Sequence, residues 1–341
     1  MSLPLELVNE IVHYILDSAP PRSGDSAEEG QNLKPDWNLI RSFTLTSHAF
    51  RHLGLASWFR QLYLPSASDL EAIDTYFPLI KSQWCRHLHC VQPSGKIIIW
   101  DLSGFQRLFS LRLDWLKKSR VDYDETGDVI PFIKADESPI RDLEIRGVRY
   151  LSPMMLNALT CPFAHVMTLK LHVEKIWCGL CHTVNSIRFP TPAPKSFEYK
   201  GGLGLPIHYA RVLYSLGSLE KVYIRILDRK HGVQTPGLSA DSNDNFWVGE
   251  CDRCMLLMYD DEKFLKAWVA RKRGSKIDGI DEKVIYKAPP RLQLVQWDFY
   301  HLDVLSDTEG EYDYLESAEE DLSDDPSDVE FPQLTDNHED A

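Results

Sequence analysis

Two pairs of cysteines have the spacing of metal ligands. Cys178 and Cys181 form one C-x-x-C pair, and Cys251 and Cys254 form the other. Four thiolates in two such pairs suit tetrahedral Zn²⁺, whose structural sites favour cysteine ligands. The 69 residues between the pairs exceed the roughly 12–20 residues of common zinc motifs, so the site forms only if the fold brings the pairs together. The alternative is that these cysteines are small buried side chains without a metal.

The first pair also matches two other chemistries. Residues Cys178 to His182 read C-x-x-C-H, the attachment sequence for covalent haem, and a C-x-x-C pair can act as a thiol redox centre. Haem attachment needs an export compartment, for which the N-terminus offers no signal. A redox pair opens a helix in a thioredoxin-like unit, whereas Val184, Ile187 and Phe189 favour a strand or loop here. Structural zinc therefore stays the metal hypothesis for the four cysteines.

No motif of a known catalytic centre occurs elsewhere in the sequence. It contains no G-x-S-x-G nucleophile elbow, no Walker loop and no H-E-x-x-H zinc motif. Gly201, Gly202 and Gly204 lack the spacing of a dinucleotide-binding loop, and they predict a turn before a helix that Pro206 opens. The 12 histidines show no ligand-like clustering. We therefore expect a non-catalytic protein without a cofactor, unless the cysteine pairs meet around zinc.

The negative charge of the chain is concentrated at its C-terminal end. The 341 residues carry a formal net charge of −14, and residues 303–341 hold 16 acidic and no basic side chains. Residues 1–302 are left with 37 basic and 35 acidic side chains, a net charge of +2. High charge and low hydrophobicity predict a disordered tail. Four of its hydroxyls have an acid three residues later, the pattern of acidophilic kinase sites: Ser306, Thr308, Ser317 and Ser327.

Several classes of protein are excluded by the sequence. No apolar run approaches the roughly 20 residues that cross a bilayer, and the N-terminus, with Glu6 and Glu10, lacks the basic region of a signal peptide. Seven cysteines, an odd number in a long chain, do not form the pattern of a secreted disulfide framework. We therefore expect a cytoplasmic or nuclear protein with neither nucleic acid nor a membrane as its partner.

The first 64 residues predict three short helices. Pro4 suits the first position of a helix, and the apolar residues at 7–16 form one stripe of an amphipathic helix. Residues 18–35 hold almost no apolar side chains and many Pro, Gly, Ser and charged residues, which predicts a disordered insertion. Helical patterns resume at 37–45 and at 50–62.

Residues 65–302 predict a body of repeated strands. Segments with apolar residues at alternate positions recur, and their first strand positions are 32, 26, 28 and 25 residues apart. This is the period of leucine-rich repeats, in which a strand and a helix or loop form one unit and stacked units share a core. Helices are expected at 152–159, 206–213 and 260–274. The first strand positions are Leu111, Leu143, Leu169, Phe197 and Val222, with a weaker segment at 292–297.

The N-terminal pattern resembles the F-box, the short helical module that docks on the Skp adaptor of cullin–RING ubiquitin ligases. Its opening is similar to Leu3-Pro4-x-Glu6-Leu7-x-x-x-Ile11. After the insertion, its second and third helices are similar to Leu39-x-x-x-Phe43-x-Leu45-x-Ser47-x-x-Phe50-Arg51-x-Leu53 and Trp58-Phe59-Arg60-x-Leu62. An F-box followed by leucine-rich repeats is a characteristic order. Segments 202–211, 268–272 and 289–297 look like the F-box-like families of mushroom-forming fungi.

The resemblance implies a substrate receptor of a cullin–RING ligase of the SCF type. The F-box would bind a Skp-type adaptor, the repeats would hold an unknown target protein, and partners would transfer ubiquitin. The expected fold class is α/β, with a three-helix F-box-like module at 1–64, a degenerate leucine-rich-repeat solenoid at 65–302 and the disordered acidic tail at 303–341. The residues expected to bind the adaptor are Leu3, Pro4, Leu7, Ile11, Leu45, Phe50, Trp58 and Phe59.

A second hypothesis gives the N-terminal helices a structural role. A repeat scaffold not associated with a ligase, with or without structural zinc, could use them as the cap that repeat arrays need at their ends. The two hypotheses differ in one structural expectation. Burial of Leu3, Pro4 and Leu7 against the first repeat indicates a cap, and their exposure indicates an adaptor-binding surface.

Overall fold

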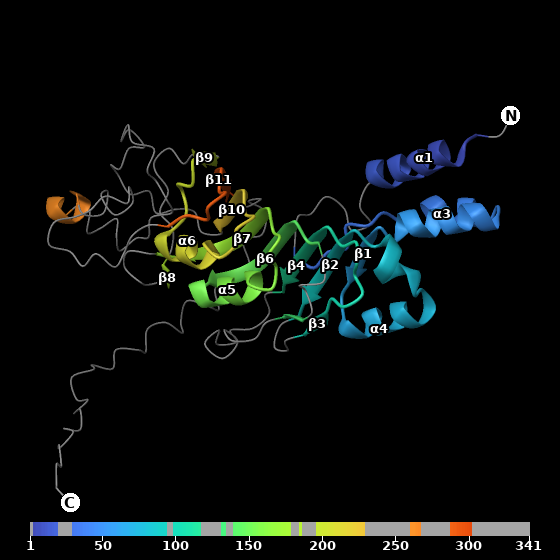
Figure 1. The fold of residues 1–341 in the computed structure, drawn as a ribbon, viewed down its shortest axis with the longest axis horizontal. Coiled ribbons are helices and arrows are strands. Elements are labelled where there is room, and N and C mark those ends of the chain that lie inside the picture. Colours follow the sequence, from blue (N-terminus) through green and yellow to red (C-terminus); the bar gives the residue numbers. More distant parts are fainter. Residues whose placement is uncertain are drawn as a thin grey trace, which may run out of the picture. The chain divides into compact units, whose positions relative to one another are not determined.

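The computed structural model describes residues 3–19, 29–93, 98–116, 131–133, 139–178, 184–185, 196–228, 260–266 and 287–301. All of them belong to one unit, residues 1–301. They form three N-terminal helices, followed by a large, mostly parallel sheet with further helices (Figure 1). The fold class expected from the sequence is confirmed at the level of a mixed α/β structure.

The three N-terminal helices pack together, and we call them the helical head. They are α1 (Leu5–Ser18), α2 (Asn38–Thr44) and α3 (His48–Trp58). Both α1 and α2 contact α3. Ser47 caps α3, because its hydroxyl accepts a hydrogen bond from the Phe50 backbone N–H at 3.1 Å. The head therefore contains the three helices that the sequence predicts.

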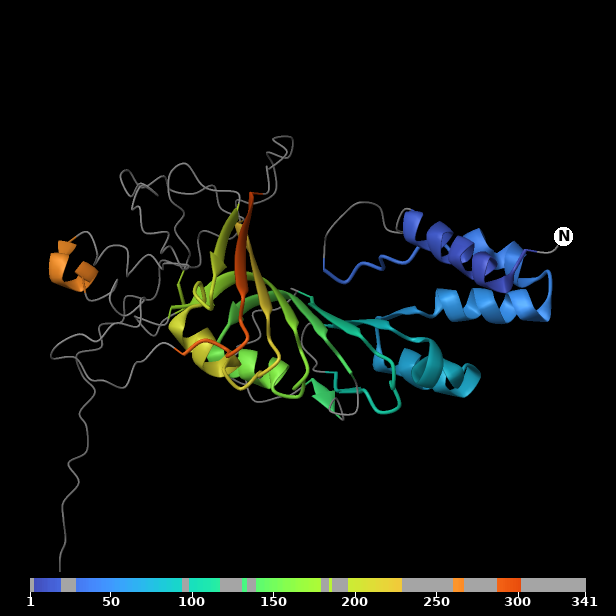
Figure 2. The same ribbon diagram turned by 45° about the horizontal axis from the view of Figure 1, so that its top comes forward.

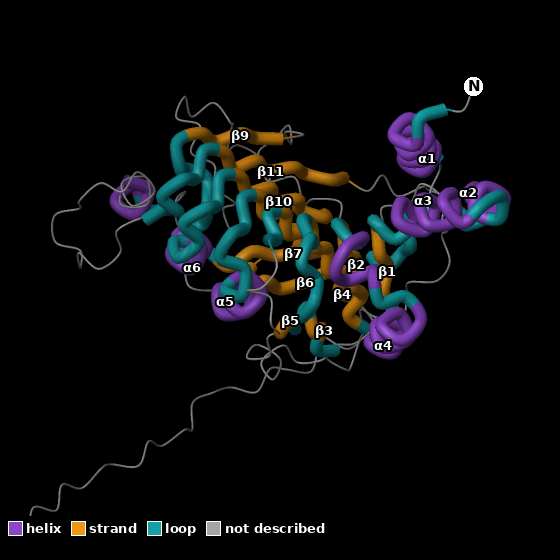
Figure 3. The backbone as a smooth tube through the Cα atoms, turned by 45° about the vertical axis from the view of Figure 1, so that its right-hand side comes forward, coloured by secondary structure: helices purple, strands orange, loops and turns teal. Residues whose placement is uncertain are grey.

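A nine-stranded sheet follows the head. Its strands are β1 (Gln61–Leu64), β2 (His87–Gln92), β4 (Ser110–Trp115), β6 (Asp142–Leu151), β7 (Thr168–Trp177), β8 (Val184–Asn185), β9 (Ser196–Lys200), β10 (Lys221–Asp228) and β11 (Leu294–His301). Their order is β1-β2-β4-β6-β7-β10-β11-β9, with β8 beside β7 (Figure 3). All neighbours from β1 to β11 in this order run parallel. A separate parallel pair joins β3 (Trp100–Asp101) to β5 (Phe132–Ile133).

One face of the large sheet is apolar and carries the core. Leu111 of β4, Leu143 of β6 and Leu169 of β7 lie opposite one another in register, and all three are buried. Helices α5 (Pro153–Thr160) and α6 (Ile207–Leu213) lie over one face of the sheet (Figure 2) and contribute buried side chains to the same core. Both helices begin where the sequence predicts them. Two more helical elements, α4 (Ala67–Tyr76) and the π-helical turn η1 (Ile80–Trp84), lie between β1 and β2 in the chain.

The alternating segments that predict strands are all strands, but the segment at Phe197 has a different place from the one expected. β10 pairs directly with β7, with Val222 opposite Leu169. β9, which holds Phe197, runs antiparallel to β11 at the edge of the sheet. Tyr199 is its one buried residue, as suits an edge strand, whereas β10 buries alternate apolar residues on its inner face. The prediction that Phe197 begins a unit of the parallel array is therefore wrong.

Two segments near the head differ from the sequence prediction. Gln61–Leu64 form the edge strand β1, with Leu62 and Leu64 buried, so the helical pattern expected to reach Leu62 stops at Trp58. Residues 29–35, at the end of the segment expected to be disordered, are described and contact the sheet. We call residues 29–35 the strap.

Other predictions hold or concern residues outside those described. The glycine turn before α6 forms as predicted, with φ of 70°, 83° and 96° at its three glycines, a region that glycine enters without strain. Of the helix expected at 260–274, only 260–266 is described, and residues 262–266 are helical. The acidic tail lies outside the described residues. Within the described part, none of the helices is long and apolar enough to span a membrane.

Candidate protein-binding surfaces

The helical head exposes a set of large apolar side chains. Leu3, Leu7 and Ile11 retain 61%, 47% and 49% of their accessible area. Leu7 and Ile11 are four residues apart and lie on one side of α1, and Leu3 lies just before the helix begins. Clustered exposed apolar side chains mark binding sites more often than isolated ones do. We call the following residues the apolar surface of the head: Leu3, Leu5, Leu7, Ile11, Tyr14, Ile15, Leu39 and Leu45.

A different side of α1 packs inside the head. Val12 is the buried residue of this helix, and Val8 and Leu16 are half-buried. Asn9 accepts a hydrogen bond of 3.5 Å from the Ser57 hydroxyl of α3. The helix therefore carries a packed stripe and, beside it, an apolar stripe that stays exposed. Burying the exposed stripe against a partner would contribute about 25 cal/mol per Å² of apolar area.

The residues expected to bind the adaptor fall into two groups. Like Leu3, Leu7 and Ile11, Pro4 and Leu45 are exposed. Phe50, Trp58 and Phe59 are half-buried, and each packs against another aromatic ring of the chain. Their partners, with distances between ring centroids, are Phe43 for Phe50 (4.8 Å), Trp37 for Trp58 (5.1 Å) and Phe77 for Phe59 (5.1 Å). The first group is available to a partner, and the second contributes to the packing of the chain itself.

The face of the sheet opposite its apolar core is polar and includes a buried carboxylate. Asp114 of β4 has no exposed area. It accepts hydrogen bonds from Arg112 at 2.6 and 2.7 Å, and it lies 2.8 Å from Nε2 of His89 on β2. Burial alone would raise the pKa of Asp114, but the hydrogen bonds and charges of His89 and Arg112 hold that pKa well below its usual value. Asp114 is therefore ionised and fixed in place by its partners.

A second charged cluster occupies the next two strands of this polar face. Glu144 of β6 accepts a hydrogen bond from Nε of Arg146 at 2.7 Å and lies 3.4 Å from Nε2 of His172 on β7. Burial and, after it, the charge of Arg146 lower the pKa of His172 to about 3, although Glu144 opposes this shift. His172 is therefore neutral near pH 7. We call these residues the polar face of the sheet: His89, Arg112, Asp114, Glu144, Arg146 and His172.

The strap is attached to this face. The Gly30 N–H donates a hydrogen bond of 2.8 Å to Oδ2 of Asp114, and the Tyr63 hydroxyl of β1 donates one to the Gly30 carbonyl. Gly30 has a φ of 79°, and a Cβ atom there would lie 2.4 Å from Cδ2 of Leu116. Glycine is therefore required at this position for its backbone conformation and for space. The composition of residues 18–35 did not predict this attachment.

The candidate metal and phosphorylation residues lie mostly outside the described part of the chain. Cys178 is buried just after β7, whereas Cys181, Cys251 and Cys254 are not among the described residues. Among the residues that are described, no group of three or more potential metal ligands occurs. The zinc hypothesis therefore stays a prediction. The same holds for phosphorylation in the tail at Ser306, Thr308, Ser317 and Ser327.

Sequence reasoning missed the polar face of the sheet. Arg112 and Glu144 occupy positions between the apolar residues that predict their strands, and they lie opposite each other in register. The alternation that locates the core therefore also locates this face. The sequence pattern does not predict β2, so it gives no sign that His89 lies beside Asp114. Opposite charges at aligned strand positions were the signal that could have found the cluster.

Comparisons with known proteins do not identify a function for this protein. No protein-family model matches the sequence, and neither the curated proteins nor the solved structures contain a significant match. The functional conclusion therefore depends on the apolar surface of the head, on the polar face of the sheet and on the resemblance of the N-terminal pattern.

Proposed function

We propose that this protein is a non-catalytic substrate receptor of a cullin–RING ubiquitin ligase. In this proposal, the helical head is an F-box-like module that binds a Skp-type adaptor through its apolar surface. The parallel sheet and its helices are a degenerate leucine-rich-repeat array that holds a target protein. Ubiquitin transfer is the task of the partner proteins, in keeping with the lack of a catalytic motif in the sequence.

The exposure of Leu3, Leu7 and Ile11 is the observation that carries the proposal. A cap for the repeat array would bury these side chains against the first strands, whereas they retain about half of their accessible area or more. All three lie in the segment that resembles the opening of an F-box, Leu7 and Ile11 on α1 and Leu3 just before it. An amphipathic helix that lays its apolar side on a partner is a recurrent mode of protein recognition.

The polar face of the sheet supports the second half of the proposal. Arg112 and Glu144 present opposite charges on adjacent parallel strands and are held by partners on the same face. Charged groups that are fixed before binding favour specific recognition, because they select a partner whose charges complement theirs. We therefore assign the target-binding role to this face and the adaptor-binding role to the head.

Calorimetric titration of the full chain with a purified Skp-type adaptor tests the proposal. The triple variant Leu3→Ala/Pro4→Ala/Ile11→Ala removes exposed apolar area from the head. We expect its affinity to fall by about thirtyfold or more, since truncating a few central contacts of an interface commonly costs 2 kcal/mol or more. The matched control, Tyr76→Ala/Ile99→Ala/Met154→Ala, removes exposed apolar side chains outside the head and should bind like the wild type.

Two outcomes would count against the proposal. Absence of binding by the wild-type chain would end it. A triple variant that binds normally but unfolds several degrees earlier than the wild type would indicate a cap, because a cap stabilises the array on which it packs. Thermal unfolding of all three proteins therefore accompanies the titration.

A further inference from the structure

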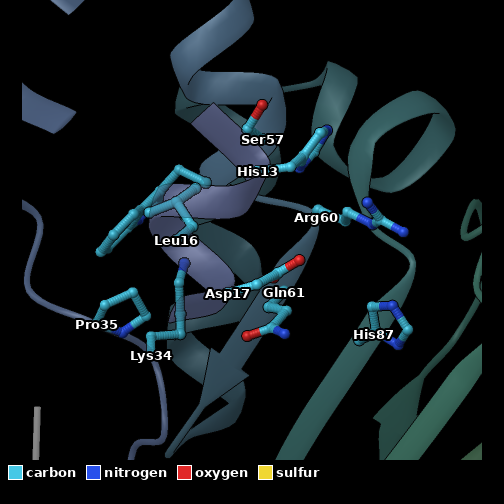
Figure 4. Close-up of a pocket in the computed structure, with 10 residues that line it drawn as sticks. His13, Leu16, Asp17, Lys34, Pro35, Ser57, Arg60, Gln61 and His87 are labelled. Carbon is cyan, nitrogen blue, oxygen red and sulfur yellow. The ribbon is translucent and has the colours of Figure 1, made fainter. Parts of the chain in front are cut away.

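A pocket of about 130 Å³ lies where the helical head and the strap meet the start of the sheet. Five of the residues that line it can carry a charge: His13 and Asp17 of α1, Lys34 of the strap, Arg60 after α3, and His87 of β2. We call it the basic pocket. Arg60 and His87 lie on one side of it and Lys34 on the other, with Asp17 between them (Figure 4).

Groups that can carry a positive charge outnumber carboxylates among the residues that line this pocket. Arg60 and Lys34 are joined by two histidines, and Asp17 is the acidic residue that lines it. Among the residues that the structure describes, neither Arg60 nor Lys34 has a carboxylate within ion-pair distance. Elsewhere in this chain, Arg112 and Arg146 each bind a neighbouring carboxylate. The basic pocket therefore differs from the polar face of the sheet, because its cations form no ion pair with the carboxylate that lines it, Asp17.

The two histidines lie within the field of Arg60. Burial lowers the pKa of His13, and the charge of Arg60 lowers it further, while Asp17 partly opposes both effects. The pKa of His87 is also lowered, first by burial and then by Arg60. Asp142 and Asp17 act in the opposite direction at His87. The charge of Arg60 thus reaches both rings, and this positive charge would attract an anion bound between them.

Lys34 faces the pocket from the opposite wall and is stabilised by aromatic rings. Its Nζ lies 4.2 Å from the centroid of the Trp58 ring and 5.3 Å from that of Phe59. Ring faces attract a cation, but they do not neutralise it. Burial lowers the pKa of Lys34 to about 7. A bound anion would restore the ammonium form, because an opposite charge nearby favours protonation.

We propose that the basic pocket binds a phosphate monoester group, with Arg60, His13 and His87 as its donors and Lys34 as a charge across the pocket. The guanidinium group matches the geometry of phosphate oxygens. A cavity of about 150 Å³ holds a molecule the size of benzene, so this pocket has room for the smaller phosphate group. The group could belong to a phosphorylated side chain of another protein or to a phosphorylated metabolite.

Calorimetric titration of the full chain at constant ionic strength tests this site with three probes. The probes are N-acetyl-phosphoserine amide, ribose 5-phosphate and sodium sulfate. We expect Arg60→Gln to weaken binding of the phosphate probes by about tenfold, the effect of one charge-assisted hydrogen bond. Arg41→Gln, which removes an exposed cation of α2 that does not line the pocket, should leave the affinity unchanged.

Asp17→Asn gives a test of opposite sign. It removes the acidic group of the pocket and should tighten binding several-fold, since like charges repel. Asp17 is exposed, so this variant should fold even if Arg60→Gln does not. Tighter binding of the phosphoserine probe than of ribose 5-phosphate would assign a phosphorylated protein as the source, and the reverse order would assign a metabolite.

Other results would overturn the proposal. These are the absence of binding of all three probes by the wild type, an equal loss of affinity in Arg60→Gln and Arg41→Gln, or weaker binding by Asp17→Asn. Because the Skp-type adaptor is absent from this experiment, its result is independent of the proposed ligase function.

Discussion

The helical head and the sheet place their apolar side chains in opposite ways. In the sheet, Leu111, Leu143 and Leu169 form aligned rows and are buried. In the head, α1 buries Val12, whereas its Leu7 and Ile11 and the preceding Leu3 are exposed. Half of the large apolar side chains that are exposed in the described part of the chain lie between residues 3 and 45. The sheet thus buries its large apolar side chains, whereas the head leaves many of its own exposed.

The difference bears on which region a partner would cover. In the described part of the chain, α5 and α6 cover apolar side chains of the sheet, and the charged residues of its polar face pair with one another. Three short helices offer too few inward positions to bury all of their apolar residues. In the proposed function, the head is the region that a partner covers, and the four predictions below test this contrast.

The largest effect is expected at the centre of the polar face. Asp114→Ala leaves the buried Arg112 and the half-buried His89 without their carboxylate, and it removes the acceptor for the Gly30 N–H. We expect the free energy of unfolding to fall by about 3–5 kcal/mol, the usual cost of removing one partner of a buried ion pair. Urea titration measures this change. Glu10→Ala, at an exposed carboxylate of α1, should change the free energy by less than about 0.5 kcal/mol.

A pair of leucine truncations compares the two regions directly. Leu171 of β7 is fully buried and Leu7 is 47% exposed. Leu171→Ala should cost about 2–5 kcal/mol, since it removes buried methyl groups and leaves a cavity. Leu7→Ala should cost less than about 0.5 kcal/mol. If urea unfolding shows a similar loss of unfolding free energy in both variants, Leu7 is part of a core. That result would contradict the difference between the head and the sheet.

A glycine of the sheet should tolerate no side chain. Gly147 has a φ of 76° at a β-bulge in β6, and a Cβ atom there would lie 2.0 Å from the Trp115 carbonyl oxygen. Gly147→Ala should therefore lower the free energy of unfolding by about 1–3 kcal/mol. Gly217→Ala is the matched control, because a methyl group at that position would have nothing within 4 Å of it. Equal melting temperatures for the two variants would contradict the close approach at Gly147.

The smallest stability effect depends on pH and belongs to His172. Its pKa is lowered to about 3 in the folded protein by burial and by Arg146, whereas an unfolded histidine titrates near 6.5. The unfolded state therefore binds more protons between these values, and stability falls as the pH falls below about 6.5. We expect a loss of about 1–2 kcal/mol between pH 6.5 and 5 that His172→Gln lacks. Identical pH profiles of the two melting temperatures would show that His172 is not buried in its neutral form.

Much of the fold could be predicted from local patterns in the sequence. Capping residues predict the helix that begins at Pro153, and alternating apolar residues predict the strands at Leu143 and Leu169. Phe197 shows the limit of such patterns. Its segment alternates like the others, yet strand order and direction depend on which neighbour buries it best, and this is decided across the sheet rather than within the segment.

The candidate surfaces also differ in whether the sequence predicts them. The exposed residues of the head, such as Leu3 and Ile11, could be named from the sequence because a helix with too many apolar positions must leave some of them outside. The pairing of Asp114 with His89 could not be predicted from the sequence. It depends on the register of two strands, and the sequence pattern does not predict one of them, β2. Lys34 and Arg60 meet in one pocket only because the strap returns to the sheet, and a polar composition gives no sign of such an attachment.

Hydrogen exchange of the full chain, alone and with a purified Skp-type adaptor, tests the central contrast most directly. The account predicts that the adaptor slows exchange of backbone amides in α1 and around Leu45, while amides in β6 and β7 keep the protection that they have without it. Unchanged exchange in α1 under conditions where the adaptor is bound, or new protection confined to the sheet, would contradict the claim that the helical head is the region completed by a partner.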